Sequence, residues 1–530
     1  MTTVVGNENL RDLWNELSAS RGDHLFLTCE DRAGHRCSFT YGEFDRLVNR
    51  TANFLRLAGV KKGDNVAIQL YNSPEYVSAT FALAKIGAVA VPINMQLVFG
   101  ECAFQFDRCA IRTVICEPDC QGYYFADAMP PCPNNTCGKR RVYPMERVFV
   151  CHSGGRLVAG AVDFDAGVDA CADVLDERCD LDGQDTAMII FTSGTTSCPK
   201  GGRSPMRTCS SPATTAIGSA LGPEDRMLTT MPAFHSNFQL AALMPVLAAG
   251  ASLVVLEKYS ARNFWRQVRE HGATAIQLVA MMARTLMMQP CDAAEREHCV
   301  RSVQYYLPIT DEEKEAFERR FSVRLQNCYG ATESICWALT DLPYGPRRWP
   351  SVGRPGLGYE AEILDETGRA VPPGTVGEIA VRGIPGISLM KGYYDDPEAT
   401  ARTVNGEGWY LSGDKGYRDE EGWFYFVDRK CNMIKRGGEN VSATEVEDAL
   451  LMHPAVAECA VIGVDDPVRD QAVKAFVVLV QGQAATVEEI TRFAACRLAD
   501  FKVPTLMEIV DELPHTSVGK VEKKLLCSLD

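Results

Sequence analysis

A turn rich in hydroxyl groups follows an apolar segment in the first half of the chain. Met188-Ile189-Ile190-Phe191 has the pattern of a buried strand, and it leads into Thr192, Ser193, Gly194, Thr195, Thr196 and Lys200. Backbone N–H groups, hydroxyls and one ammonium in such a turn can wrap phosphate oxygens. The spacing does not fit G-x-x-x-x-G-K-[ST], so the turn is not a Walker-type phosphate loop. An ordinary surface turn is the alternative for any few of these residues.

Three further groups of residues could act together with such a turn. They are Tyr329-Gly330-Ala331-Thr332-Glu333, Gly413-Asp414-Lys415-Gly416, and Gly519-Lys520 near the C-terminus. Thr332 and Glu333 are typical of a helix cap, but beside a triphosphate Glu333 could bind Mg²⁺, which prefers oxygen ligands. Asp414 could accept the hydroxyls of a ribose, although G-D-x-G is also a common turn. Lys520, taken alone, indicates only a solvated surface lysine.

The composition limits the possible partners. The chain has 530 residues, of which 46% are hydrophobic and 23% charged, and its net charge is −15. This acidic balance argues against a nucleic-acid binder. The first residues lack a basic and apolar leader, so we expect a cytoplasmic protein. Residues 240–256 are nearly all apolar, but Pro245 and Gly250 interrupt them, which favours a buried helix and strand over a membrane span.

Cysteines are numerous but are not spaced as metal ligands. The chain contains 21 cysteines. They are dense between Cys102 and Cys151, where neither a C-x-x-C pair nor a histidine occurs. In a long chain without a secretory leader, reduced thiols are a better interpretation than disulfides or a structural zinc site.

Apolar strands alternate with helical patterns through the first four hundred residues. Residues 65–70 and 88–92 read as strands around a helix at 75–85, and this βαβ pattern predicts parallel sheets covered by helices on both faces. From about residue 351, short strands separated by turns predict a small β-barrel-like subdomain. After residue 428 the pattern is again mixed. We therefore predict an α/β protein with a large N-terminal domain, 1–428, built on two parallel-type sheets, and a small C-terminal α+β domain, 429–530.

In this order, the motifs resemble the adenylate-forming family, which includes acyl-CoA synthetases, nonribosomal-peptide adenylation domains and firefly luciferase. The resemblance runs from Ser38-Phe39-Thr40-Tyr41-Gly42-Glu43 to Lys520 and covers nearly the whole chain. Phrases such as Arg347-Arg348-Trp349-Pro350-Ser351 are most similar to those of bacterial ligases of the crotonobetaine/carnitine type. The resemblance implies an AMP-forming acid–thiol ligase that uses ATP, Mg²⁺ and coenzyme A.

The resemblance also implies roles for individual residues. A carboxylate would attack the α-phosphate of ATP to give an acyl-adenylate and pyrophosphate, and a thiol would then displace AMP. The turn from Thr192 to Lys200 would hold the β- and γ-phosphates, Thr332 and Glu333 would organise Mg²⁺, and Lys520 would neutralise charge as the first bond forms. The remaining residues implied are Asp414 and Arg429 at the ribose, Tyr329 at the nucleotide, Lys435 and Asn440 near its phosphate, and His235 near the acyl carboxylate.

Members of this family rotate the small domain between the two steps. Here the pivot would be Cys431, where many relatives carry Asp or Lys, and Gly437 and Gly438 would flank the pantetheine channel. A second departure is that residues 201–209, after the phosphate turn, contain no histidine. His235 taken alone would be interpreted as a buried core histidine.

The acyl group is harder to predict than the nucleotide. Met281 and Trp337 fall in segments that would form the acyl pocket, and aromatic faces suit a trimethylammonium acid such as crotonobetaine, carnitine or γ-butyrobetaine. Asn237 stands where an acidic residue is expected in carnitine-type ligases, so a short or medium-chain aliphatic acid stays open. An enzyme that loads a carrier protein and a non-catalytic nucleotide-binding relative also stay open. The expected partners of the ligase are the small acid, ATP and CoA, and its oligomeric state is not predicted.

Overall fold

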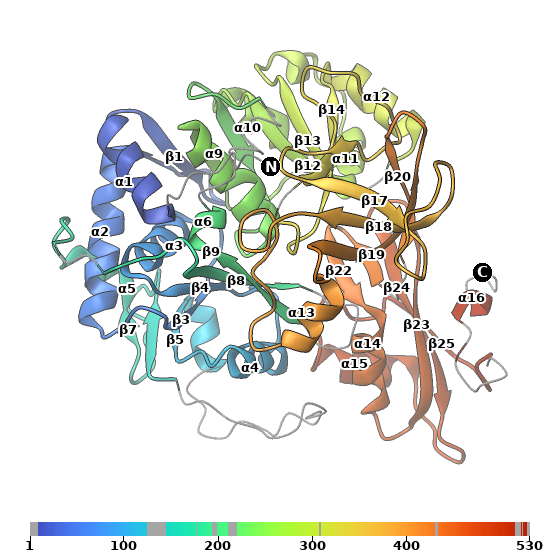
Figure 1. The fold of residues 1–530 in the computed structure, drawn as a ribbon. Coiled ribbons are helices and arrows are strands. Elements are labelled where there is room, and N and C mark those ends of the chain that lie inside the picture. The colour runs from blue at the N-terminus through green and yellow to red at the C-terminus, as the bar shows by residue number, and fades with distance from the viewer. Residues whose placement is uncertain are drawn as a thin grey trace.

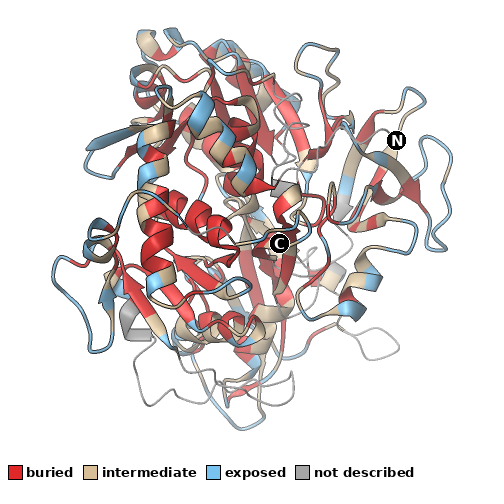
Figure 2. Cartoon of the chain, turned by 60° about the vertical axis from the view of Figure 1, so that its left-hand side comes forward, coloured by how far each residue is buried: buried red, intermediate tan, exposed pale blue. Residues whose placement is uncertain are grey.

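The computed structural model describes residues 9–123, 145–176, 179–192, 199–209, 220–306, 309–335, 337–429, 433–514, 521 and 523–526. Two large sheets form the body of the molecule, and a smaller C-terminal part packs beside them (Figure 1). Burial is concentrated in the sheets and in the helices that cover them (Figure 2). None of the helices in these ranges is both long and apolar enough to cross a membrane.

The seven-stranded sheet has the order β7-β6-β5-β3-β4-β8-β9. Its strands are β3 (Asn65–Gln69), β4 (Val89–Pro92), β5 (Thr113–Cys116), β6 (Arg147–Val150), β7 (Val162–Asp163), β8 (Thr186–Thr192) and β9 (Lys200–Pro205). All neighbours are parallel except β8 and β9, which form an antiparallel hairpin. This hairpin carries the two ends of the predicted phosphate turn, Thr192 and Lys200.

The nine-stranded sheet has the order β16-β15-β14-β13-β12-β10-β11-β1-β2. Its strands are β1 (Leu25–Glu30), β2 (Arg36–Thr40), β10 (Arg226–Thr229), β11 (Ser252–Leu256), β12 (Ala275–Val279), β13 (Ser302–Tyr306), β14 (Leu325–Gly330), β15 (Trp337–Thr340) and β16 (Arg354–Pro355). The central strands are parallel, and the edges β2, β15 and β16 pair antiparallel. The prediction of parallel sheets is confirmed.

The helix α3 (Pro74–Ile86) shows how local sequence positions these sheets. Ser73 caps its first turn by accepting from the Tyr76 amide, and Gly87 ends it with a φ of 75°, a left-handed conformation that glycine adopts without strain. Every residue from Tyr76 to Ile86 is buried. From Tyr76 onward the helix is therefore buried on all sides, because it crosses from β3 to β4 under other helices. The remaining helices of the body are α1 (Leu10–Ser20), α2 (Tyr41–Leu57), α4 (Phe99–Arg108), η1 (Pro118–Tyr123), α5 (Phe164–Asp169), α6 (Met206–Cys209), α10 (Phe264–Glu270), α11 (Ala280–Met287), η3 (Ala293–Arg296) and α12 (Asp311–Phe321).

The apolar segment that might have spanned a membrane is a buried helix followed by the strand β11, as predicted. The helix is not uniform, however: α8 (Ser236–Phe238), the π-helical turn η2 (Gln239–Leu243) and α9 (Met244–Ala249) follow one another. Pro245 has no N–H to donate to the carbonyl of Ala241, and a wider turn before it relieves the clash. Gln277 Nε2 donates to that carbonyl at 3.3 Å instead.

After the body, the chain forms a four-stranded antiparallel sheet of β17 (Glu360–Leu364), β18 (Gly377–Arg382), β19 (Trp409–Arg418) and β20 (Phe424–Arg429), with α13 (Pro397–Thr403) between β18 and β19. This sheet is the predicted small β subdomain. The C-terminal part has its own sheet, in which β21 (Met433–Arg436), β22 (Glu439–Ser442), β23 (Val456–Asp466), β24 (Asp470–Leu479) and β25 (Leu506–Ile509) pair, covered by α14 (Ala443–Leu451) and α15 (Val487–Ala495) and followed by α16 (Lys523–Leu526). Its apolar side chains, among them Val441, Val446 and Val461, form a separate core. The division at 428/429 stays a prediction.

Candidate active site

A cavity of about 1710 Å³ lies where both large sheets, the four-stranded sheet and the C-terminal domain meet. Thr192, Val279 and Gly330 line it, and they stand at the carboxyl ends of β8, β12 and β14. Ligands of open α/β sheets bind at this edge. A pocket for one small ligand occupies roughly 300–1,000 Å³, so the cavity has room for more than one substrate.

The predicted phosphate site gathers opposite charges at the β8–β9 hairpin. Thr192 Oγ1 donates to Glu333 Oε1 and to the Lys200 carbonyl, each at 3.4 Å. Tyr393 Oη donates to the same Glu333 oxygen at 2.6 Å, and Lys200 Nζ lies 5.3 Å from the centre of the Tyr393 ring. Burial and the charge of Glu333 raise the pKa of Tyr393, so the phenol keeps its proton and donates it. The predicted Ser193, Gly194, Thr195 and Thr196 lie outside the described residues.

Thr332 and Glu333 do not cap a helix. Residues 331–335 form a turn between β14 and β15, so the helix-cap interpretation is wrong. Thr332 Oγ1 donates to Ser236 Oγ at 3.3 Å, and Glu333 is 8% exposed at the cavity wall. Its carboxylate and the nearby hydroxyls are the oxygen donors that Mg²⁺ prefers. Within the described residues no group of three His, Cys, Asp or Glu side chains is arranged to hold a metal ion, so a metal ion beside Glu333 would need ligands from the substrate as well.

The predicted ribose site is partly described. Tyr329 Oη donates to Asp414 Oδ2 at 2.7 Å, and both residues line the cavity. The register of β19 and β20 places Asp414 opposite Arg429. The side chain of Arg429 lies outside the described part of the chain, so its role stays a prediction.

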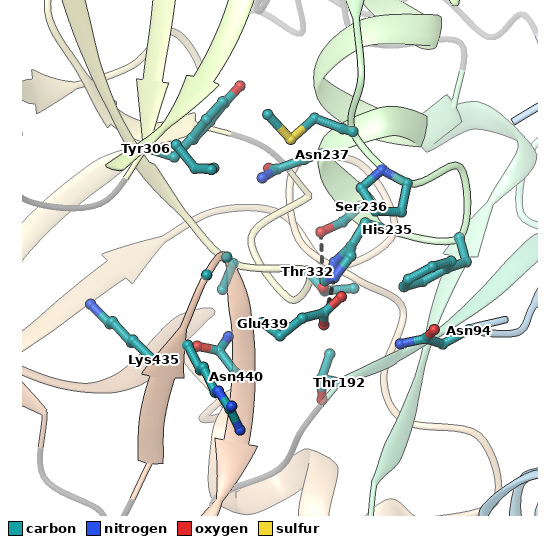
Figure 3. Close-up of a pocket in the computed structure, with 18 of the residues that line it drawn as sticks. Asn94, Thr192, His235, Ser236, Asn237, Tyr306, Thr332, Lys435, Glu439 and Asn440 are labelled. Carbon is teal, nitrogen blue, oxygen red and sulfur yellow. Dashed lines mark hydrogen bonds and ion pairs between the residues drawn. The ribbon is translucent and has the colours of Figure 1, made fainter. Parts of the chain in front are cut away.

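The C-terminal domain contributes a tight turn to the cavity. Gly437 and Gly438 connect β21 to β22 with φ values of 60° and 93°, and a Cβ on Gly438 would lie 3.8 Å from the Val279 side chain. The backbone of one domain thus approaches the end of β12 in the other. Lys435 and Asn440, which flank the turn, also line the cavity (Figure 3).

One ion pair between the domains closes this side of the cavity. His235 Nε2 lies 3.0 Å from Glu439 Oε2, with the two side chains 32% and 19% exposed (Figure 3). Burial alone would lower the pKa of His235, but Glu439 outweighs it and raises that pKa above its usual value. Burial would likewise raise the pKa of Glu439, yet His235 holds it below its usual value. The interpretation of His235 as a core histidine is therefore wrong. Sequence reasoning missed Glu439, although it directly follows Gly437-Gly438.

The cavity continues into a neutral pocket. This part of the cavity is lined by the uncharged side chains of Asn237, Met281 and Tyr306, and Tyr306 lies across from Asn237 (Figure 3). The assignment of Asn237 and Met281 to the acyl pocket stays a prediction. Trp337 lies behind this wall, where its Nε1 donates to Tyr306 Oη at 3.0 Å. Gln277 Nε2 donates to the same hydroxyl at 3.2 Å. Nothing in the local sequence shows that Tyr306 faces the cavity.

The predicted Lys520 and Cys431 lie outside the described residues. The neighbouring Val521 packs against the apolar side of β23 and β24, in a cluster with Leu513 and Leu526. In Figure 1 the short helix α16 lies at the outer edge of the C-terminal domain, beyond β25. Leu513, Val521 and the described residues of α16 are not among those that line the cavity.

Relatives of known activity match the whole chain. A crotonobetaine/carnitine–CoA ligase from Salmonella arizonae is 43% identical, and the match covers 99% of both proteins. The ligase of the same name from Proteus mirabilis is 42% identical over 99% of both. Among solved structures, o-succinylbenzoate–CoA synthetase from Bacillus subtilis with a bound product analogue has a TM-score of 0.82 at 25% identity, over 98% of both chains. ATP-bound MatB from Rhodopseudomonas palustris has a TM-score of 0.69 at 25% identity, over 98% of this chain and 99% of MatB.

Family profiles agree with the relatives. The profile described as AMP-binding enzyme matches residues 15–394, and the AMP-binding enzyme C-terminal domain matches residues 445–520. The first range contains the β8–β9 hairpin, the Thr332–Glu333 turn and the neutral pocket, and the second lies within the C-terminal domain. The chain therefore belongs to the AMP-binding enzyme family and is an AMP-forming acyl-CoA synthetase, which joins a carboxylic acid to CoA at the expense of ATP through an acyl-adenylate.

Proposed function

We propose that this ligase activates a betaine-type acid, with crotonobetaine, carnitine or γ-butyrobetaine as the substrate. The observation that carries the proposal is the whole-length similarity to ligases of that name. The neutral pocket is compatible with it, because the Tyr306 ring and the Asn237 side chain lie across from each other there, and an aromatic face attracts a trimethylammonium group. The reacting carboxylate would then point toward the hairpin of Thr192 and Lys200.

In the first half-reaction the main obstacle is repulsion between a carboxylate and the phosphates of ATP. We assign the phosphates to the Thr192–Lys200 turn, the ribose to Asp414 and Arg429, and the charge between carboxylate and α-phosphate to Lys520. Fixed positive charge at the forming bond stabilises the transition state without reorganisation. Mg²⁺, bound beside Glu333 and Thr332, would neutralise phosphate charge. His235, Lys435 and Asn440 would orient the acyl carboxylate and the α-phosphate.

In the second half-reaction the C-terminal domain would present Gly437 and Gly438 to the pantetheine of CoA, after rotation about Cys431. The arrangement described here suits this step, because the glycine turn lines the cavity while Val521 and the described residues of α16 do not. The structure also resembles o-succinylbenzoate–CoA synthetase with its product analogue more closely than it resembles ATP-bound MatB, with TM-scores of 0.82 and 0.69. This difference supports the assignment of the arrangement to the second half-reaction.

Three alternatives need to be tested against this proposal: an acyl group other than a betaine, an acceptor other than CoA, and a non-catalytic role. The side chains of Met281 and Met282 could hold a short or medium-chain aliphatic acid, since methionine adapts to varied apolar shapes. A carrier protein could replace CoA as the acceptor. A non-catalytic relative is disfavoured, because the matched relatives are ligases and Lys200, Glu333 and Asp414 are all present.

The deciding experiment measures thioester formation from ATP, Mg²⁺ and CoA with carnitine, crotonobetaine, γ-butyrobetaine and hexanoate, ranked by kcat/KM. We expect one of the three betaines to lead. Hexanoate in first place would contradict the betaine assignment but leave the ligase activity intact. Pyrophosphate release without a CoA thioester would indicate a carrier protein as the acceptor.

Asn237→Asp is expected to favour cationic acids further. A carboxylate across from Tyr306 would attract a trimethylammonium group, and a partly buried attraction worth about 1.4 kcal/mol corresponds to a tenfold gain in the ratio of kcat/KM for γ-butyrobetaine to that for hexanoate. The measurement is that ratio in the variant and the wild-type enzyme. An unchanged ratio would show that the cationic end of the acid does not reach Asn237.

The pair of His235 and Glu439 predicts a pH dependence of the second half-reaction. In the arrangement described here, which we call the docked arrangement, Glu439 of the C-terminal domain reaches His235 and raises its pKa. The attraction between the two side chains is therefore complete below the usual histidine pKa of about 6.5, and it is lost as the pH rises through the raised value. We expect wild-type thioester formation from supplied acyl-adenylate to exceed that of Glu439→Gln at low pH and to approach it at high pH. The ratio of the two rates removes the ionisation of the CoA thiol, which both enzymes share. A ratio independent of pH would contradict the pair's role.

We also propose that the enzyme acts in the cytoplasm. Cys102, Cys116 and Cys151 are buried thiols, and burial raises the pKa of each, so they resist oxidation and metal binding. Such thiols are compatible with a reducing compartment. Two further cysteines between Cys102 and Cys151, Cys132 and Cys137, lie outside the described residues.

A further inference from the structure

A buried lysine joins the two domains at the edge of the cavity. Lys502 Nζ, in the C-terminal domain, lies 2.6 Å from Glu101 Oε1 of α4 and 2.7 Å from Glu445 Oε1 of α14. The exposed fractions of the three side chains are 7%, 10% and 17% in that order. Figure 1 shows α4 beside α14 and α15 at this contact. One ammonium thus binds two carboxylates, of which only Glu445 belongs to its own domain.

This lysine depends on its partners to stay charged. Burial alone would lower the pKa of Lys502, but Glu445 and Glu101 together raise it above its usual value. Burial raises the pKa of Glu445, and the nearby charge of Glu101 acts in the same direction. The two carboxylates therefore repel each other, and the ammonium between them is what holds Glu101 and Glu445 together. A buried arrangement of this kind favours one geometry strongly.

The contact can nevertheless open without leaving either ion without a hydrogen-bond partner. Glu101 has a second partner in its own domain, because its Oε2 accepts from the Val98 amide at 3.0 Å at the start of α4. Lys502 retains Glu445. A buried ion that lost every partner would be strongly destabilising, but here each ion keeps one. The geometry suits a contact that forms and breaks when a domain turns.

Among the residues that the structure describes, two other ion pairs cross the same boundary. His235 pairs with Glu439, and Arg284 Nη1 lies 2.8 Å from Asp470 Oδ1. Their side chains are more exposed than those of Lys502 and Glu101, at 32% and 19% for the first pair and 18% and 12% for the second. Water screens the more exposed pairs more strongly. The contact of Glu101 with Lys502 is therefore expected to contribute most to the docked arrangement.

We propose that Glu101 is a positioning residue for thioester formation. Through Lys502 it holds the C-terminal domain in the orientation that brings Gly438 and Glu439 to the cavity. Glu101 itself touches no reacting atom. The inference rests on the proposed function, in which this orientation serves the second half-reaction and a different one serves adenylation.

Glu101→Gln tests the proposal most directly. The amide has the same length and can still accept from the Val98 amide, but it carries no charge for Lys502. We expect thioester formation from supplied acyl-adenylate and CoA to fall about tenfold, while pyrophosphate release in the first half-reaction stays within about twofold of wild type. Equal loss in both half-reactions, or no loss in either, would overturn the proposal.

Glu43→Gln is the matched control. Glu43 occupies the corresponding third position of α2, where its Oε2 accepts from the Thr40 amide at 2.8 Å on an exposed surface. The substitution makes the same chemical change at a helix start that faces no other domain. We expect both half-reactions to match wild type, and a loss equal to that of Glu101→Gln would assign the effect to the cap.

Lys502→Met, alone and combined with Glu101→Gln, tests whether Glu101 acts through this lysine. If it does, adding Glu101→Gln to Lys502→Met changes the thioester rate little, because the partner is already gone. Two full and additive losses would show that Glu101 acts elsewhere. Lys502→Met could lower the stability of the C-terminal domain, but the single variant Lys502→Met and the double variant share that effect. The comparison between these two enzymes therefore remains informative.

Amide hydrogen exchange without substrates separates failure of the inference from failure of the proposed function. Glu101→Gln should speed exchange in residues 437–442, which the docked arrangement covers, and Glu43→Gln should not. This result would hold even if none of the betaines were a substrate. Unchanged exchange in residues 437–442 would overturn the inference while leaving the ligase activity untouched.

Discussion

Lys520→Ala is expected to abolish formation of the acyl-adenylate and to spare the reaction of a supplied adenylate with CoA. An ammonium that neutralises charge between the carboxylate and the α-phosphate stabilises only the first transition state. Removing one such preorganised group typically costs about 10²–10³ in rate. The measurement is pyrophosphate release with the preferred acid, compared with single-turnover thioester formation from synthetic adenylate.

Lys523→Ala is the matched control for this experiment. Lys523 stands three residues further along, in α16, where its ammonium lies 2.6 Å from Glu447 of the same domain. The variant removes a lysine from the same end of the chain without removing the one assigned to the phosphate. Both half-reactions should match wild type. If Lys520→Ala instead slowed the two half-reactions equally, the assignment of Lys520 to adenylation would be wrong.

Glu333→Gln is expected to reduce adenylation by about 10²–10³ as well, for a different reason. The amide can still accept hydrogen bonds from Tyr393 and Thr192, so the turn keeps its shape, but its charge for Mg²⁺ is gone. We expect the Mg²⁺ concentration for half-maximal pyrophosphate release to rise together with the loss of rate. High Mg²⁺ should then recover part of the activity, because the substrate phosphates still supply ligands.

Tyr393→Phe distinguishes the metal from the hydrogen bond. This variant removes the 2.6 Å donor to Glu333 and leaves the carboxylate in place. Loss of one buried hydrogen bond to a charged group costs roughly 1.5–3 kcal/mol, so a smaller fall in rate is expected, with an unchanged requirement for Mg²⁺. If Glu333→Gln also left the Mg²⁺ requirement unchanged, the carboxylate would serve to position the turn instead of the metal.

The central chemistry of the site could be predicted from short segments. Thr192 and Lys200 are brought together by one hairpin, and Gly437 and Gly438 form one turn, so local sequence contains the information for both. The βαβ pattern around α3 is equally local, because capping residues and apolar periodicity act within a few turns. The family resemblance then supplied the roles, which neither the spacing nor the composition could give.

Predictions that depended on a neighbour distant in the sequence were the ones that failed or stayed open. Thr332 and Glu333 have good capping chemistry, yet they form a turn whose partners are Ser236 and Tyr393. Trp337 was expected in the acyl pocket and lies behind Tyr306 instead. Capping preference is worth about 1 kcal/mol, which packing between sheets easily exceeds.

The sequence by itself determined which groups could meet a nucleotide and an acid, since residue types and short spacings decide that chemistry. Only the tertiary structure decided which charges meet across the domain boundary. Glu101 and Lys502 are 401 residues apart in the chain, and His235 and Glu439 are 204 apart. Nothing local favours either pair, because such contacts form only when separate hydrophobic cores have packed and brought the charged side chains within reach.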